Sequence, residues 1–162
     1  MPASPDTAQD ASPDFSLGAP LYSGTFEFTL DQKKRLTIPS GWRSNSLKEL
    51  YIVKASTRKC LLAMPREVLR ALGNKVGQLQ GASPSRQQTF RRRFFAAVAT
   101  CGVDSQGRVL LSDDLCRYAG IERDIVLTGN DDSFEIWSPA EVQRDQEETD
   151  PLYNTTMADL GL

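Results

Sequence analysis

The sequence predicts an α+β domain in which two copies of one unit, related by a pseudo-twofold axis, interleave into a small β-barrel. A pattern that begins at Asp31 and ends at Arg43 recurs from Asp104 to Arg117. Segments that alternate polar and apolar residues flank each pattern, and segments with helical spacing of apolar residues follow. A repeat of this length indicates a duplicated supersecondary unit, and one copy alone is too small to enclose a core.

The first copy is expected to begin with a hairpin, since two alternating segments flank a tight turn at residues 31–34. A proline then suits the first turn of each of two helices. The expected elements are strands at 25–30 and 35–38, a short helix from Pro39 to about Leu47, strands at 51–55 and 59–63, and a longer helix from Pro65.

The second copy is expected to repeat this order. A helix from Ser85 joins the copies, and its Phe90, Phe94 and Val98 recur at helical spacing. Serine caps and a terminal glycine delimit the later helices. The expected elements are strands at 97–103 and 108–111, a short helix from Ser112 to Gly120, strands at 125–128 and 133–137, and a helix from Pro139 to about Asp150.

Composition divides the chain further. The predicted segments are an N-terminal arm at 1–22, a first repeat at 23–82, a second repeat with its linking helix at 83–150, and a C-terminal tail at 151–162. The arm is rich in Pro, Ser, Ala and Asp, which predicts disorder. Both ends are acidic, whereas residues 26–137 hold 18 basic and 12 acidic residues. This basic middle is suited to a polyanion, although an ordinary mixed surface explains the charge equally well.

Several classes of function are not expected. The chain has no histidine, no phosphate-binding glycine loop and no nucleophile–base pair, so we expect neither an enzyme nor a metal, cofactor or small-molecule site. Cys60, Cys101 and Cys116 lack metal-ligand spacing, and we interpret them as reduced thiols of a cytoplasmic protein. We see neither a secretory signal nor an apolar run long enough for a membrane span.

The two turns carry the candidate site. Asp31 precedes Arg35 by four residues, and Asp104 precedes Arg108 in the same way. Two interpretations are open: the Asp–Arg pair is a structural clip across the turn, or the turn presents a cation to phosphate. Lys33 and Lys34 favour the second, because alternation along an extended segment points at least one of these side chains outward.

Other arginines are ambiguous. Arg43 and Arg117 suit an internal ion pair as well as a ligand contact. For the run at 91–93 we favour a solvated helix face, or an interface with acids of a neighbouring chain, because a helix cannot point three consecutive residues one way.

Together these motifs resemble the MraZ family, bacterial transcriptional regulators with a duplicated AbrB-like domain. The resemblance covers about residues 23–148. It is carried by Leu30-Asp31-x-x-x-Arg35-Leu36-x-Ile38-Pro39-x-x-x-Arg43, Cys60-Leu61-Leu62 with Pro65, Asp104-x-x-Gly107-Arg108-x-Leu110-Leu111, Tyr118-Ala119-Gly120-Ile121, Val126-x-x-x-Gly129, and Phe134-Glu135-Ile136-Trp137.

The resemblance implies a fold and a function. It implies an AbrB-like, double-split β-α-β barrel that binds double-stranded DNA at tandem repeats upstream of its own operon of division and cell-wall genes. It further implies a nucleoid-associated repressor that assembles into a homo-oligomeric ring. The residues implied at the DNA are Arg35 and Arg108, to which we add Lys33 and Lys34, with Asp31, Asp104 and Gly107 orienting the loops.

The first loop departs from the family. Members usually have glycine where this chain has Lys34, and lysine rarely adopts a positive φ. We therefore expect either a reshaped turn or an added phosphate contact, and expect the more cationic first loop to dominate phosphate affinity. Two alternatives stay open: a protein-interaction scaffold with incidental DNA binding, and an AbrB-type antitoxin, against which the duplication argues.

Overall fold

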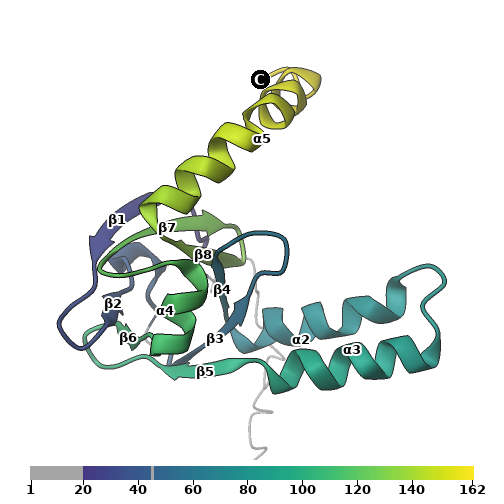
Figure 1. Cartoon of the computed structure of the whole chain (residues 1–162), viewed down its shortest axis with the longest axis horizontal. Helices are drawn as coiled ribbons and strands as arrows, with labels where there is room; N and C mark the ends of the chain where they lie inside the picture. The colour runs from purple at the N-terminus through teal and green to yellow at the C-terminus, as the bar shows by residue number, and fades with distance from the viewer. Residues whose placement is uncertain (1–19, 45) are drawn as a thin grey trace, which may run out of the picture.

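A computed structural model describes residues 20–44 and 46–162 and confirms the α+β class (Figure 1). Its strands are β1 (Thr25–Thr29), β2 (Arg35–Thr37), β3 (Glu49–Lys54), β4 (Leu61–Met64), β5 (Ala99–Gly102), β6 (Arg108–Leu110), β7 (Asp124–Asn130) and β8 (Ser133–Trp137). Its helices are α2 (Arg66–Asn74), α3 (Pro84–Ala96), α4 (Asp113–Ala119) and α5 (Pro139–Asp159), with 3₁₀ turns η1 (Ser40–Trp42) and η2 (Lys75–Gln78). In Figure 1 the α2–α3 hairpin and α5 project from the strands in different directions.

The two copies exchange strands. The larger sheet has the order β1-β7-β8-β4-β3-β5, and all its pairings are antiparallel. Strand β1 of the first copy pairs with β7 of the second, and β5 of the second copy pairs with β3 of the first. The strand order is unchanged when the copies are interchanged, so each copy supplies an edge strand to the other.

The predicted hairpin at 25–38 forms only as a turn. Asp31 N donates to Arg35 O at 3.1 Å, and beyond this bond the strands separate, because β1 pairs with β7 and β2 pairs with β6. The predicted barrel is likewise not one closed sheet within the described residues. Strands β2 and β6 form a separate two-stranded sheet, called here the small sheet.

One hydrophobic core joins the copies. Leu36 and Ile38 of the first copy lie buried in the same cluster as Val109 and Leu111 of the second. An aromatic group spans the same boundary, since Phe134 lies against Tyr22 and Trp42, with ring centroids 5.4 and 5.1 Å apart respectively. Tyr22 falls at the end of the predicted arm, yet it is buried and its N–H donates to Asp131 O at 2.8 Å. Residues 1–19 of the arm predicted at 1–22 lie outside the described residues.

Two helix lengths differ from expectation. The helix expected from Pro39 to Leu47 is only the 3₁₀ turn η1, because Trp42 enters the core and Arg43 is already extended. Helix α5 does not end near Asp150 but continues to Asp159 through Pro151. Pro151 has no N–H to donate, but this part of the helix is exposed, so water can satisfy the carbonyl left without a partner.

The boundaries of α4 are as expected. Ser112 Oγ accepts a hydrogen bond from Leu115 N at 3.2 Å, and Gly120 ends the helix with a φ of 69°. These caps place Asp113 and Asp114 in the first helical turn, beside the small sheet's first loop.

Candidate nucleic-acid interface

The small sheet has one buried and one outward face. Its register pairs Leu36 with Val109, and both are buried, with exposed fractions of 1% and 0%. Because successive side chains of a strand point to opposite faces, the neighbouring residues lie together on the outward face. These residues are Arg35 opposite Leu110, and Thr37 opposite Arg108. We call these four residues the outer face.

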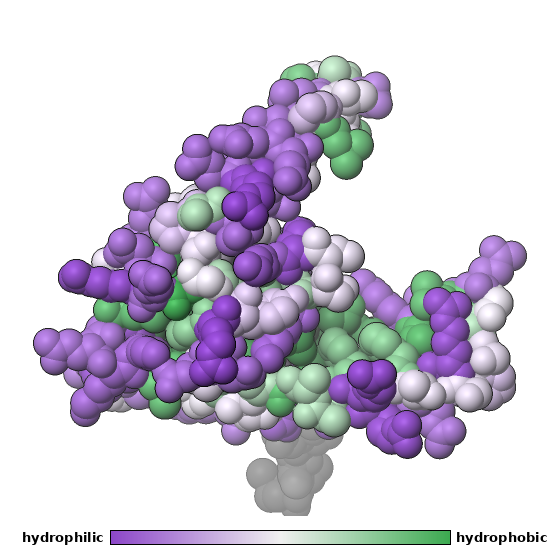
Figure 2. Space-filling model, in the orientation of Figure 1, coloured by the Kyte–Doolittle hydropathy of each residue, from purple (hydrophilic) through white to green (hydrophobic). Residues whose placement is uncertain are grey.

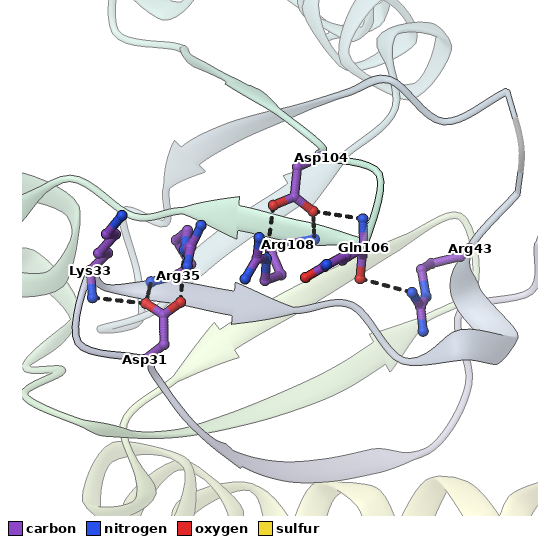
Figure 3. Close-up of polar contacts among 7 residues, drawn as sticks. All are labelled: Asp31, Lys33, Arg35, Arg43, Asp104, Gln106 and Arg108. Carbon is purple, nitrogen blue, oxygen red and sulfur yellow. Dashed lines mark hydrogen bonds and ion pairs between the residues drawn. The ribbon is translucent and has the colours of Figure 1, made fainter.

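The first turn is closed by one carboxylate. Asp31 Oδ1 accepts hydrogen bonds from the backbone N–H groups of Lys33 and Arg35, both at 2.9 Å. Asp31 Oδ2 accepts a third bond from Arg35 Nε at 2.7 Å (Figure 3). The carboxylate thus holds both the loop backbone and the arginine side chain.

The second turn repeats this arrangement. Asp104 Oδ1 accepts from Gln106 N and Arg108 N at 2.9 Å each, and Asp104 Oδ2 accepts from Arg108 Nε at 2.8 Å. Figure 3 shows Arg35 and Arg108 on the two paired strands, with their aspartates on opposite sides. The clip interpretation is confirmed. It is compatible with binding, because within the described residues no hydrogen bond engages the terminal nitrogens of either guanidinium.

Lys34 adopts the conformation that glycine has in the second loop. Its φ is 59°, against 75° at Gly107, so the turn is not reshaped. The backbone hydrogen bonds also correspond, since Lys34 O accepts from Leu111 N and Gly107 O accepts from Ile38 N. The ammonium group of Lys34 pairs with Asp113 of α4, which offsets part of its charge.

The positive φ of Lys34 predicts a measurable strain. A Lys34→Gly variant should be more stable than a Lys34→Ala variant by about 1 kcal/mol, because a Cβ at this φ meets the backbone. The comparison is matched, since both variants lose the ion pair to Asp113. Urea denaturation of both proteins measures the difference, and equal free energies of unfolding would show that the loop accommodates the Cβ without cost.

Arg43 acts within the protein. Its Nη1 donates to Gln106 O at 2.9 Å, so it holds the second loop. A Cβ at Gly107 would lie 2.4 Å from Arg43 Cδ, so Gly107 supplies space as well as its positive φ. Arg117, its counterpart, instead lines a shallow pocket with Lys34 and Asp113.

The clips stabilise the ionised form of their aspartates. Hydrogen bonds from the backbone N–H of Arg35 and of Arg108 are the main reason that the pKa values of Asp31 and Asp104 lie below their usual range. The arginine side chains and a second backbone N–H lower these pKa values further. Folding therefore favours the carboxylates over the neutral acids.

A pH dependence follows from these lowered pKa values. The stability from the clips is fully present above the ordinary Asp pKa of about 4 and is lost as the pH falls through the lower folded-state values. When the urea midpoint of unfolding is measured from pH 7 downward, it should therefore begin to decrease once the pH is lower than about 4. An Asp31→Asn/Asp104→Asn variant should show a shallower decline, with the remainder due to groups such as Asp113. An unchanged slope would mean that the clips do not contribute.

The structure brings only some of the predicted site residues together on the outer face. Arg35 and Arg108 share the outer face, and Lys33 is exposed in the first loop. Lys34 forms an ion pair with Asp113 of α4. Thr37 and Leu110 were not predicted as site residues. The alternation of residues within each strand places Thr37 and Leu110 on the same face as the arginines. Whether that face is exposed depends on which side of the small sheet the core covers.

The arginine run at 91–93 belongs to a different element, α3. Arg91 Nη1 donates to Gly73 O at 3.1 Å and to Asn74 Oδ1 at 2.7 Å, so this residue joins α3 to α2. Among the described residues no cluster of Cys, Asp and Glu side chains is placed to hold a metal ion. No helix in that part of the chain is long and apolar enough to cross a membrane.

Comparison with known proteins identifies similar chains. A family model described as "MraZ protein, putative antitoxin-like" matches residues 94–158. A transcriptional regulator MraZ of Symbiobacterium thermophilum is 36% identical over 138 residues, which cover 85% of this chain and 99% of the relative. One of Leuconostoc citreum is 39% identical over 119 residues, covering 73% and 81%. One of Herpetosiphon aurantiacus is 36% identical over 118 residues, covering 73% and 81%.

Proposed function

The chain belongs to the MraZ family, and from this membership we propose that it is a DNA-binding transcriptional regulator. The observation that carries the proposal is the outer face of the small sheet. There Arg35 and Arg108 are each held through Nε by a carboxylate, which leaves the terminal nitrogens for a ligand. A two-stranded antiparallel ribbon fits the major groove of DNA, and arginine can bind guanine there with two hydrogen bonds.

The loops at the two ends of the outer face would bind the flanking phosphates. Lys33 is exposed beside Arg35 and adds a cation to the first loop. The net positive charge of residues 26–137 also supports the binding of negatively charged phosphates. One chain offers few such contacts, so its affinity at cellular salt should be modest.

Finer parts of the proposal rest on the family resemblance. We propose that the protein represses its own operon of division and cell-wall genes, at tandem repeats upstream, in the nucleoid. A homo-oligomeric ring would engage several repeats together and gain affinity through effective concentration. A pseudo-twofold axis through the small sheet would make the two arginines equivalent. The exchange symmetry of the strand order supports this axis.

DNA binding is tested by titrating the wild-type chain against two duplexes over a range of salt concentrations. One duplex carries the sequence upstream of its own gene and the other is a scrambled control. We expect preference for the upstream duplex and an affinity that falls steeply with salt, since each neutralised phosphate contributes a slope of about −0.9 in log K against log salt. Weak, salt-insensitive binding without preference would instead favour the protein-interaction alternative.

A further inference from the structure

The outer half of α5 carries an apolar stripe that nothing in the described chain covers. From Gln146 to Leu162 every residue is exposed except Met157, which is half-buried. Tyr153, Met157 and Leu160 recur at i, i+4 and i+7, so they lie on one side of the helix, and Leu152 lies beside them. The exposed fractions of Leu152, Tyr153 and Leu160 are 72%, 60% and 69%.

This stripe continues a face that is buried nearer the sheet. Val142, in the first turns of α5, packs against Val126 and Trp137, and helical spacing places it on the same side as Tyr153. Beyond it α5 extends away from the strands, and hydrophobic residues are visible at its far end (Figures 1 and 2). Because helices in proteins are stabilised mainly by packing an apolar face, the outer half of α5 needs a partner.

The outward side of α3 offers a complementary surface. Phe90 and Phe94 stack with ring centroids 5.1 Å apart, and Phe90 is exposed. Arg86 and Arg93 lie on the same side, and with the two rings they line a shallow groove. Neither arginine forms an ion pair within residues 20–44 and 46–162. We call this surface the α3 groove.

Charge selects the α3 groove over a second α5 as the partner. The α5 stripe is bordered by Glu148 and Asp159 on one side and by Asp150 on the other. Two α5 helices packed together would bring these acids face to face. In the α3 groove the same carboxylates would meet Arg86 and Arg93, and the apolar stripe would cover the stacked rings.

We propose that the outer half of α5 docks into the α3 groove of a second copy of this chain. In its own chain α5 and the α2–α3 hairpin project in different directions, which leaves both surfaces open to a neighbour (Figure 1). The contact joins two different surfaces, so it is head-to-tail and adds copies until the arrangement closes. It deepens the proposed ring, on which it rests, by assigning the residues that connect adjacent copies.

The test uses two full-length variants, each with one surface disabled. Phe90→Asp disables the groove, and Tyr153→Asp disables the stripe, since each places a carboxylate in the apolar contact. Light scattering after size exclusion should give an oligomer for wild type and a single chain of 17.9 kDa for each variant. An equimolar mixture should restore a dimer of twice that mass, because one variant retains the stripe and the other retains the groove.

The controls separate this contact from other effects. Arg86→Glu/Arg93→Glu provides a second disabled groove that leaves the aromatic rings intact, and it should also run as a single chain. Leu21→Asp alters an exposed apolar residue on neither surface and should keep the wild-type mass. A wild type that is a single chain, variants that keep the oligomer, or a mixture that stays monomeric would each overturn the proposal.

DNA binding serves as the independent readout. The variants leave the outer face unchanged, so they should still shift a short duplex at low salt. Loss of assembly with retained DNA binding is the expected result. An intact head-to-tail contact in a protein that does not bind DNA would contradict the proposed function alone, whereas DNA binding lost in the Arg86→Glu/Arg93→Glu variant but not in Tyr153→Asp would assign α3 to DNA instead.

Discussion

The double variant Arg35→Ala/Arg108→Ala should no longer bind the upstream duplex at moderate salt, while its oligomer mass should be unchanged. Both guanidinium groups lie on the outer face, and Asp31 and Asp104 fix their orientation through Nε. Each arginine that binds a guanine edge contributes about 1–3 kcal/mol, so losing both leaves only loop contacts to phosphate. Fluorescence anisotropy with a labelled duplex measures the loss.

Matched variants define what the arginines do. Arg70→Ala removes an exposed arginine from α2 and should leave the affinity unchanged. Arg35→Lys/Arg108→Lys keeps the charge but not the planar donor pair, so it should retain salt-dependent binding and lose preference for the upstream duplex. If the double alanine variant still binds at moderate salt, the outer face is not the DNA surface.

The single alanine variants test whether the loops are equivalent. We expect Arg35→Ala to lose more phosphate affinity than Arg108→Ala, because Lys33 adjoins only the first loop. The pairing of Lys34 with Asp113 reduces this asymmetry. A larger loss for Arg108→Ala would show that the second loop dominates.

Phe134→Ala should destabilise the whole domain by about 3–5 kcal/mol, the usual cost of truncating a fully buried aromatic ring. Phe134 comes from the second copy, but its ring packs against Tyr22 and Trp42 of the first. Because β1 and β5 also pair with strands of the opposite copy, neither copy should stay folded when the other unfolds. Tryptophan fluorescence and near-ultraviolet circular dichroism should therefore report one coincident unfolding transition, shifted to lower urea.

The exposed Leu21 supplies the comparison for this prediction. Leu21→Ala removes apolar atoms that are already mostly in water and should change stability by less than about 0.5 kcal/mol. Two separate transitions in wild type or in Phe134→Ala would contradict the shared core and indicate that each copy folds alone.

The local conformation of the candidate site was predictable from short sequence patterns. An aspartate four residues before an arginine closes each turn because the carboxylate reaches backbone N–H groups only two and four residues away. Lys34 occupies the position of Gly107 in the other copy and shares its positive φ, so the alternative of a reshaped turn was wrong. Such contacts depend on neighbours along the chain, so a single sequence contains them.

Two of the predictions that were wrong depended on distant partners. Residues 25–38 alternate as a hairpin should, yet each strand pairs with the other copy, where it can bury its apolar side in the joint core. The helix expected to reach Leu47 stops because Trp42 turns into that core. Alternation identifies a strand but not its partner.

The sequence by itself therefore determined the duplication, the α+β class, the caps of α4 and the positions of the two Asp-x-x-x-Arg turns, while the structure showed that each Asp–Arg pair is a clip. The caps and turns follow from backbone propensity and short-range hydrogen bonds, and the duplication follows from the repeated motif. Only the tertiary structure decided that β2 and β6 pair, that Thr37 and Leu110 join the arginines on the outer face, and that Lys34 is held by Asp113. The physical reason is that these arrangements arise from burying Leu36 against Val109, and two residues from different copies meet only when the whole core assembles.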